Sequence, residues 1–275
     1  MEKLRRLDEA AAAGGGGDYR RLTRRLYPGL FVAVAGMRQG ELKTDLDTAA
    51  FLYEEVGRAW SAAGDAPPDC ERERPDTYRP LCLGPAGGSV RQLLLAKARL
   101  HARWAEAAVK AFRGAADGET SRLLSEMKAA RAYDLLIAAR VSETLKSLEE
   151  IVHTSPSYAD YLEHRAEAKV SPEKLEAEFV GALGRAGALL GWLPRSPVYY
   201  HLSSARRSYG DGLFWYWKVH GSKKMVVSAA AGFERDPLQE MRLDAGRVGY
   251  TVVTNWKAAA KYTRLAEQSL AAVAR

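Results

Sequence analysis

The chain has 275 residues, 47% of them hydrophobic and 27% charged, as in a globular protein that can bury a core without disulfides or metals. Its longest apolar run near the start, at 30–36, is far shorter than the ~20 residues of a membrane span, and no apolar signal segment opens the sequence. We therefore expect a soluble, cytoplasmic protein. The net charge of +7 favours an anionic partner.

The first 40 residues are basic and contain the low-complexity segment AAAAGGGGD at 10–18. Such a segment is typical of a flexible joint. We therefore expect 1–40 to be a basic N-terminal arm and 41–275 to be a single domain.

The rest of the chain is dominated by helical signals. Serine or aspartate followed by proline, which suits an N-cap and the first helical position, stands at 155–156, 171–172, 196–197 and 236–237. Apolar residues recur with a helical period between these points. The spacing predicts helices over 41–63, 89–113, 119–152, 156–168, 172–190, 197–221 and 247–273.

The predicted fold is all-α: an irregular bundle of four to five long helices with shorter peripheral helices. An α-hairpin array is the alternative. The one long irregular connection is a loop over 64–88, which contains both cysteines, Cys70 and Cys82. Their spacing is compatible with a disulfide and equally with two free thiols.

The stretch ARRSYGDGLFWYWKVHGSKK at 205–224 combines aromatic and basic residues. On a helical period, Tyr209, Leu213 and Tyr216 share one face, which predicts an amphipathic helix that packs its rings in the core. Gly210 and Gly212 weaken that helix. They favour either a turn followed by a short strand or a close approach by another backbone or a ligand.

The same stretch is a candidate binding surface, because basic side chains bind phosphates while aromatic rings stack on bases. No known nucleic-acid-binding motif accompanies it, and the alternative is a solvated helix face. A second group of cations falls on one face of the 89–113 helix. The candidate contacts are Arg206, Arg207, Lys218, Lys223 and Lys224, followed by Arg99, Arg103 and Lys110.

Glu150 and His153 form a Glu-x-x-His pair, which is one part of the ligand set of di-iron carboxylate bundles. A second such pair is absent, and a histidine near a helix C-terminus is also favoured by the helix dipole alone. The pair is therefore a candidate for metal binding, and the sequence indicates no particular cofactor.

No nucleophile motif or phosphate-binding loop is present. The sequence favours a non-catalytic helical binding protein that engages nucleic acid or an acidic protein surface through basic helix faces. One alternative is a metal- or cofactor-binding enzyme with its site inside the bundle. Another is a structural subunit of a complex.

Overall fold

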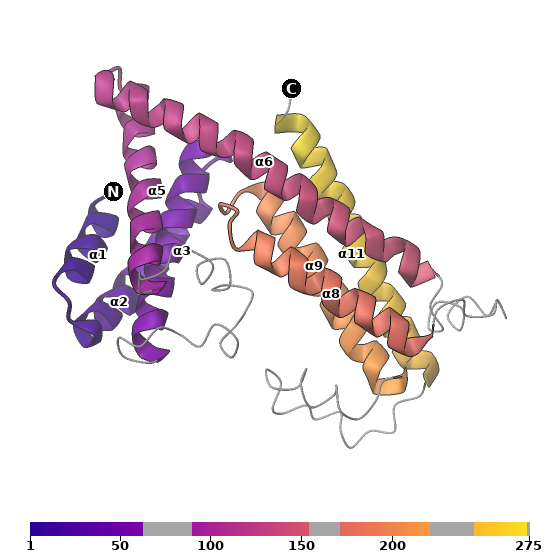
Figure 1. Ribbon diagram of the computed structural model, residues 1–275. Helices are drawn as coiled ribbons and strands as arrows, with labels where there is room; N and C mark the ends of the chain where they lie inside the picture. The colour runs from indigo at the N-terminus through magenta and orange to yellow at the C-terminus, as the bar shows by residue number, and fades with distance from the viewer. Residues whose placement is uncertain (63–89, 154–170, 221–244, 274–275) are drawn as a thin grey trace. The chain divides into compact units, whose positions relative to one another are not determined.

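The computed structural model describes residues 1–62, 90–153, 171–220 and 245–273 (Figure 1). All secondary-structure elements within these residues are α-helices, and none is a strand. The all-α prediction is thus confirmed. Within these residues, no helix has the length and apolar character needed to cross a membrane. The helices are α1 (Glu2–Ala12), α2 (Gly16–Ala35), α3 (Glu41–Ala62), α5 (Val90–Phe112), α6 (Gly118–His153), α8 (Pro172–Leu190), α9 (Pro197–His220) and α11 (Ala245–Val273).

Contacts divide the chain into two compact units. The first unit comprises Met1–Ile137 and Gly191–Pro197, and the second comprises Ala138–Leu190 and Val198–Arg275. The division falls inside α6, so this one continuous helix contributes its N-terminal part to the first unit and its C-terminal part to the second.

Several helix ends follow from local chemistry. Asp117 caps α6, because its carboxylate accepts a hydrogen bond from the Thr120 backbone N–H at 2.7 Å, and this bond lowers the pKa of Asp117. Ser171 caps α8 in the same way through the Lys174 N–H at 3.3 Å. Beyond the end of α5, Gly114 has a φ of +72°, which glycine adopts readily. The Ser-Pro helix starts at 172 and 197 are confirmed.

The residues predicted as a basic arm are helical in the structure. Gly14, with a φ of +80°, makes the turn between α1 and α2, and Pro28 is accommodated inside α2. Buried side chains of both helices join α3 and α5 in one hydrophobic cluster, which includes Leu4, Leu7, Tyr19, Leu26, Tyr53, Val56 and Leu94. Residues 1–35 therefore contribute to the core of the first unit.

The second unit has an aromatic core, formed by α8, α9 and α11. The Phe179 ring lies 5.3 Å from Trp256 and 6.0 Å from Tyr209, measured between centroids, and Tyr216 lies 6.0 Å from Trp256. Tyr209 and Tyr216 are fully buried. The predicted packing role of these rings is confirmed, and α9 is continuous from Pro197 to His220.

Gly212 explains part of the glycine pattern in α9. A Cβ atom at this position would lie 2.5 Å from Trp256 Nε1, so the missing side chain is what allows the indole of α11 to approach. A Cβ atom added to Gly210, by contrast, would have no neighbouring atom within 4 Å. A close approach therefore occurs at Gly212, but it is made by the side chain of Trp256 and not by another backbone or a ligand, as the sequence suggested.

The segment 191–197, which completes the first unit, is held by contacts to α3 and α5. Lys97 Nζ donates to the Trp192 carbonyl oxygen at 3.1 Å, and the Arg195 backbone N–H donates to Thr48 Oγ1 at 2.8 Å. The Arg195 guanidinium lies 3.6 Å from the centroid of the Phe51 ring. The predicted helix over 156–168, the helix start at 236–237, the 64–88 loop and both cysteines lie outside the described residues.

Candidate anion-binding site

Helix α5 has one exposed, charged side and one buried side. Arg99, Arg103, Glu106 and Lys110 follow one another at helical spacing, so they share one side of the helix. All four are exposed. On the opposite side, His101 and Trp104 are buried. The predicted cationic group Arg99, Arg103 and Lys110 thus does lie on one face.

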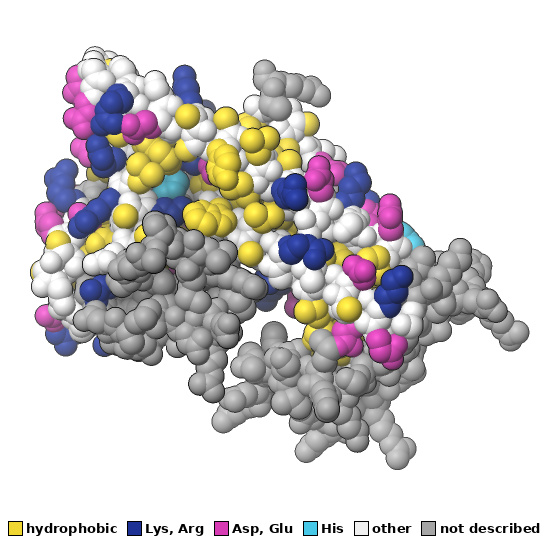
Figure 2. Space-filling view, in the orientation of Figure 1, with side chains coloured by type: hydrophobic (Ala, Val, Ile, Leu, Met, Phe, Trp, Pro, Cys, Tyr) yellow, Lys and Arg dark blue, Asp and Glu magenta, His cyan; other side chains and the backbone are white. Residues whose placement is uncertain are grey.

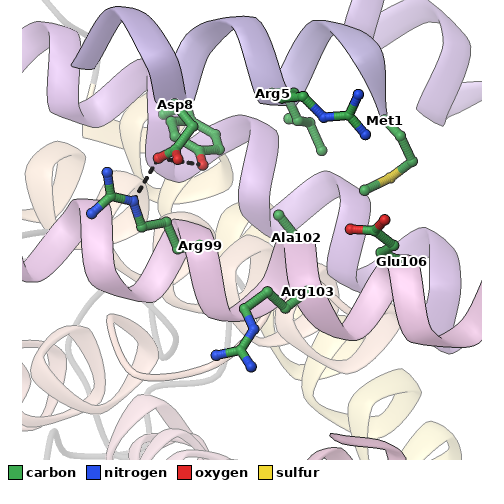
Figure 3. A pocket seen from close by; sticks show the side chains of 9 residues that line it. Met1, Arg5, Asp8, Arg99, Ala102, Arg103 and Glu106 are labelled. Atoms are coloured by element: carbon green, nitrogen blue, oxygen red, sulfur yellow. Dashed lines mark hydrogen bonds and ion pairs between the residues drawn. The ribbon is translucent and has the colours of Figure 1, made fainter. Parts of the chain in front are cut away.

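A pocket of about 240 Å³ lies in the first unit between α1, α3 and this face of α5 (Figure 3). Asp8 and Arg99 lie together in the close-up, while Met1 and Glu106 lie near one another further along. The lining residues are Met1, Leu4, Arg5, Asp8, Tyr53, Arg99, Ala102, Arg103 and Glu106.

Arg99 is fixed in this pocket by a hydrogen-bonded chain. Its Nε donates to Asp8 Oδ1 at 2.6 Å, and the Tyr53 hydroxyl donates to the same oxygen at 3.2 Å. The Tyr19 hydroxyl donates to the Tyr53 carbonyl oxygen at 2.7 Å. Burial, and secondly the Asp8 charge, raise the pKa of Tyr53, so the phenol stays protonated and remains a donor.

The other charges of the pocket are only loosely paired. Arg5 lies 3.6 Å from Glu2 and Arg103 lies 3.4 Å from Glu119, and all four side chains are largely exposed. Ion pairs of this kind contribute little to stability, so the two arginines remain accessible to a ligand. Glu106 has no hydrogen bond or ion pair within the described part of the chain.

Sequence reasoning identified Arg99 and Arg103 but missed Arg5, Asp8 and Tyr53. Asp8 and Arg99 are separated by 91 positions in the chain. No local spacing signals that pairing, which arises because α1 packs against α3 and α5. The one available hint was the apolar periodicity of Leu4, Leu7 and Ala11, which marks α1 as a packed helix.

The second predicted group, in and after α9, is more dispersed. Arg206 is half-buried and its Nε donates to the Leu183 carbonyl oxygen at 3.0 Å, so it serves packing within the second unit. Arg207 is exposed, 3.9 Å from Asp211. Lys218 lies in the last turn of α9, and Lys223 and Lys224 lie outside the described residues.

The metal candidates Glu150 and His153 are both exposed near the end of α6. Within the residues that the structure describes, no group of three or more His, Cys, Asp or Glu side chains is placed to hold a metal ion. The described fold therefore adds no further ligand to this pair.

A buried charged cluster ties together α3, α5 and α6 in the first unit, and the sequence did not predict it. Asp45 Oδ1 accepts a hydrogen bond from His101 Nδ1 at 2.7 Å and pairs with Arg131 Nη2. Arg131 Nη1 also pairs with Asp134 at 3.1 Å, and its guanidinium lies 5.6 Å from the Trp104 ring centroid. Asp45 is completely buried.

Burial lowers the pKa of His101, and the hydrogen bond to Asp45 only partly opposes this effect. Because Arg131 already balances the Asp45 charge, His101 is neutral and donates through Nδ1. One feature of the sequence could have indicated that Asp45 is buried. Asp45 lies at helical spacing before Ala49, Leu52 and Val56, which are buried on the same face of α3.

On the exposed side of α5, opposite the buried His101, positive and negative side chains are interspersed. Figure 2 shows Lys and Arg side chains mixed with Asp and Glu over the face of the first unit that it presents, without a continuous basic area. Any anion site here is therefore local. Three arginines from two helices, Arg5, Arg99 and Arg103, line the pocket, with their guanidinium groups pointing in different directions (Figure 3).

Comparison with known proteins gives no match to any family model, curated protein or solved structure.

Proposed function

We propose that this chain is a non-catalytic helical binding protein whose partner is anionic, and that the partner contacts the α5 face of Arg99, Arg103 and Lys110. The observation that supports the proposal most is the pocket itself, which Arg5, Arg99 and Arg103 line from two helices. The excess positive charge of the chain favours the same class of partner. The proposal takes the protein to be cytoplasmic.

Arg99 supports this function better than the α9 arginines do. Its Nε is held by Asp8, which orients the guanidinium before a partner arrives. Preorganisation reduces the entropy lost when a side chain is fixed on binding. Arg206, by contrast, already donates to a backbone carbonyl in its own unit.

The test is binding of short single-stranded and duplex nucleic acids over a salt series, with an acidic polypeptide as the competitor. Arg103→Glu reverses an exposed charge beside the pocket, and Arg207→Glu is a matched control because it reverses an exposed charge on α9. We expect salt-sensitive binding that Arg103→Glu weakens and Arg207→Glu leaves nearly unchanged. Phosphate contacts give a slope of log affinity against log salt of about −0.7 to −0.9 each.

Absence of binding to nucleic acid and to the acidic polypeptide at low salt would overturn the proposal. Equal weakening by both variants would overturn the assignment to α5, because it would show attraction to the whole charge of the chain. Stronger competition by the acidic polypeptide would identify a protein surface as the partner.

A further inference from the structure

We infer that α2 binds the surface of a membrane that contains anionic phospholipids, with its exposed face toward the lipid. This face, called here the α2 stripe, consists of exposed residues that share one side of the helix. Its members are Arg21, Arg24, Arg25, Pro28, Phe31, Val32 and Ala35. The inference goes beyond the proposed function, because it concerns another helix and another partner, and it does not rest on the α5 surface.

The C-terminal half of the α2 stripe is apolar and open to solvent. Phe31 is 53% exposed and Val32 is 70% exposed. Pro28 and Ala35 are exposed on the same side of the helix. A single exposed apolar side chain is common on a protein surface, whereas a group of them on one helix face marks an interaction surface.

The N-terminal half of the α2 stripe is cationic. Arg21 is paired with Asp18, so its charge is already balanced. Arg24 and Arg25, by contrast, make no hydrogen bond or ion pair with any residue that the structure describes. Anionic lipid can therefore neutralise these two guanidinium groups without breaking an internal ion pair.

Helix α1 adds a further positive charge beside this face. A Cβ atom at Gly29 would lie 2.6 Å from Lys3 Nζ, so the Lys3 ammonium group lies against α2. Gly29 stands at helical spacing between Arg25 and Val32. The Lys3 charge is thus located where the cationic and the apolar halves of the α2 stripe meet.

The separation of the two halves along the helix matches the depth of a lipid headgroup layer. Seven residues separate Arg25 from Val32, which is about 10 Å along the helix axis. The polar headgroup region on one side of a bilayer is about 5–7 Å thick. If α2 is tilted with its C-terminal end deeper, Val32 and Phe31 reach the acyl chains while Arg25 contacts lipid phosphates.

A membrane fits both halves of the α2 stripe, whereas the other anionic partners fit one. Nucleic acid attracts Arg24 and Arg25, but its bases stack on aromatic rings and offer little to Pro28 and Val32. An acidic protein would need an apolar groove shaped to the convex surface of α2. Lipid chains need no such groove, because they adapt to the side chains that enter them.

The experiment measures binding of the full chain to lipid vesicles by co-sedimentation over a salt series. One set of vesicles consists of phosphatidylcholine alone, and the other also contains phosphatidylserine. Each basic residue near an anionic surface strengthens binding about fivefold. We therefore expect binding to the anionic vesicles to be at least about tenfold tighter, and to weaken as the salt concentration rises.

Two pairs of variants assign this binding to the α2 stripe. Val32→Ser removes apolar atoms that enter the lipid and should weaken binding about fivefold to tenfold. Leu136→Ser is its matched control, because Leu136 of α6 is also 70% exposed, and it should have no effect. Arg25→Gln should weaken binding about fivefold, whereas Arg207→Gln, which removes an exposed charge of α9, should change it little. Circular dichroism confirms that each variant is folded.

Absence of binding to the anionic vesicles at low salt would overturn the inference. Equal effects of Val32→Ser and Leu136→Ser would also overturn it, because no apolar part of α2 would then enter the lipid. Equal effects of Arg25→Gln and Arg207→Gln would show attraction to the whole charge of the chain instead. If Arg25→Gln weakens binding of a single-stranded oligonucleotide but not of vesicles, the α2 stripe contacts nucleic acid and the inference is wrong. None of these results decides the α5 contact, which Arg103→Glu tests separately.

Discussion

A single missing side chain organises the aromatic core of the second unit. Gly212 in α9 leaves room for the indole of Trp256 in α11, which also contacts Phe179 and Tyr216. From the sequence, Gly210 and Gly212 are equivalent helix-weakening residues. The structure distinguishes them, since only the second faces a neighbouring ring at close range.

Alanine substitution should therefore have opposite effects at these two positions. Gly212→Ala places a methyl group 2.5 Å from Trp256 Nε1, and such overpacking should lower the free energy of unfolding by about 1–3 kcal/mol. Gly210→Ala meets no atom within 4 Å and should raise it by about 0.4–1 kcal/mol. Urea denaturation followed by circular dichroism measures both values, and equal stability of the two variants would contradict this account.

At the scale of elements, α6 is connected to α3 and α5 through charge as well as through apolar contact. Trp104 and Ala107 of α5 pack against Leu123 and Met127 of α6. Beside this cluster, Asp45 of α3 accepts from His101 of α5 and pairs with Arg131 of α6. The three helices thus share one buried carboxylate.

The buried histidine of this junction predicts a pH dependence of stability. The pKa of His101 is lowered in the folded chain, whereas an unfolded histidine titrates near 6.5. The unfolded state therefore binds more protons, so stability is complete above about pH 6.5 and falls as the pH decreases below it. The loss should approach, at most, about 1.4 kcal/mol per pH unit.

Urea unfolding of wild type and His101→Gln at pH 7.5 and 5.5 measures this effect. Glutamine can still donate to Asp45 but does not titrate, so the decrease attributable to His101 should disappear in the variant. The groups that face His101 are Asp45, Lys97, Arg131 and Asp134. The raised pKa of Asp134 makes stability increase as the pH decreases, which is opposite to the effect of His101, but it does so in both proteins. Identical pH profiles of wild type and His101→Gln would contradict the assignment of the pH dependence to His101.

Most helices could be predicted from the sequence, because capping residues and apolar periods are local signals. The predicted range 172–190 is the range of α8, and 89–113 and 119–152 differ from α5 and α6 by one residue at each end. Glycines and Pro28 concealed α1 and α2, whose helical state depends on burying Leu7 and Tyr19 against α3. The pocket and the Asp45 junction could not be predicted, since each joins residues that are distant in sequence.

At the scale of the whole molecule, the two units have separate cores. The cluster around Tyr53 and Leu94 belongs to the first unit, and the rings around Trp256 belong to the second. No sequence signal marks this division, because it falls inside the continuous apolar pattern of α6. Composition and net charge describe the chain as a whole, so they do not indicate where the boundary between the two units lies.

Separate cores predict separate unfolding transitions. Asp45→Asn removes the charge that balances Arg131, and breaking a buried pair of this kind costs about 3–5 kcal/mol. Calorimetry should show two transitions, one lowered by Asp45→Asn and the other by Gly212→Ala. A single transition that both variants shift would show instead that the shared helix α6 makes the chain unfold as one unit.

The segment 191–197 has a consequence for how the protein is made on the ribosome. This segment follows α8 in the chain but belongs to the first unit, where the Arg195 N–H reaches Thr48 and Trp192 accepts from Lys97. The first unit therefore cannot be completed when its helices α1 to α5 emerge, because synthesis must first pass through α8. Its nascent helices have to remain competent for folding while more than fifty further residues, Ala138–Leu190, are added. Any shortened gene that ends before residue 197 would yield a first unit without its closing segment.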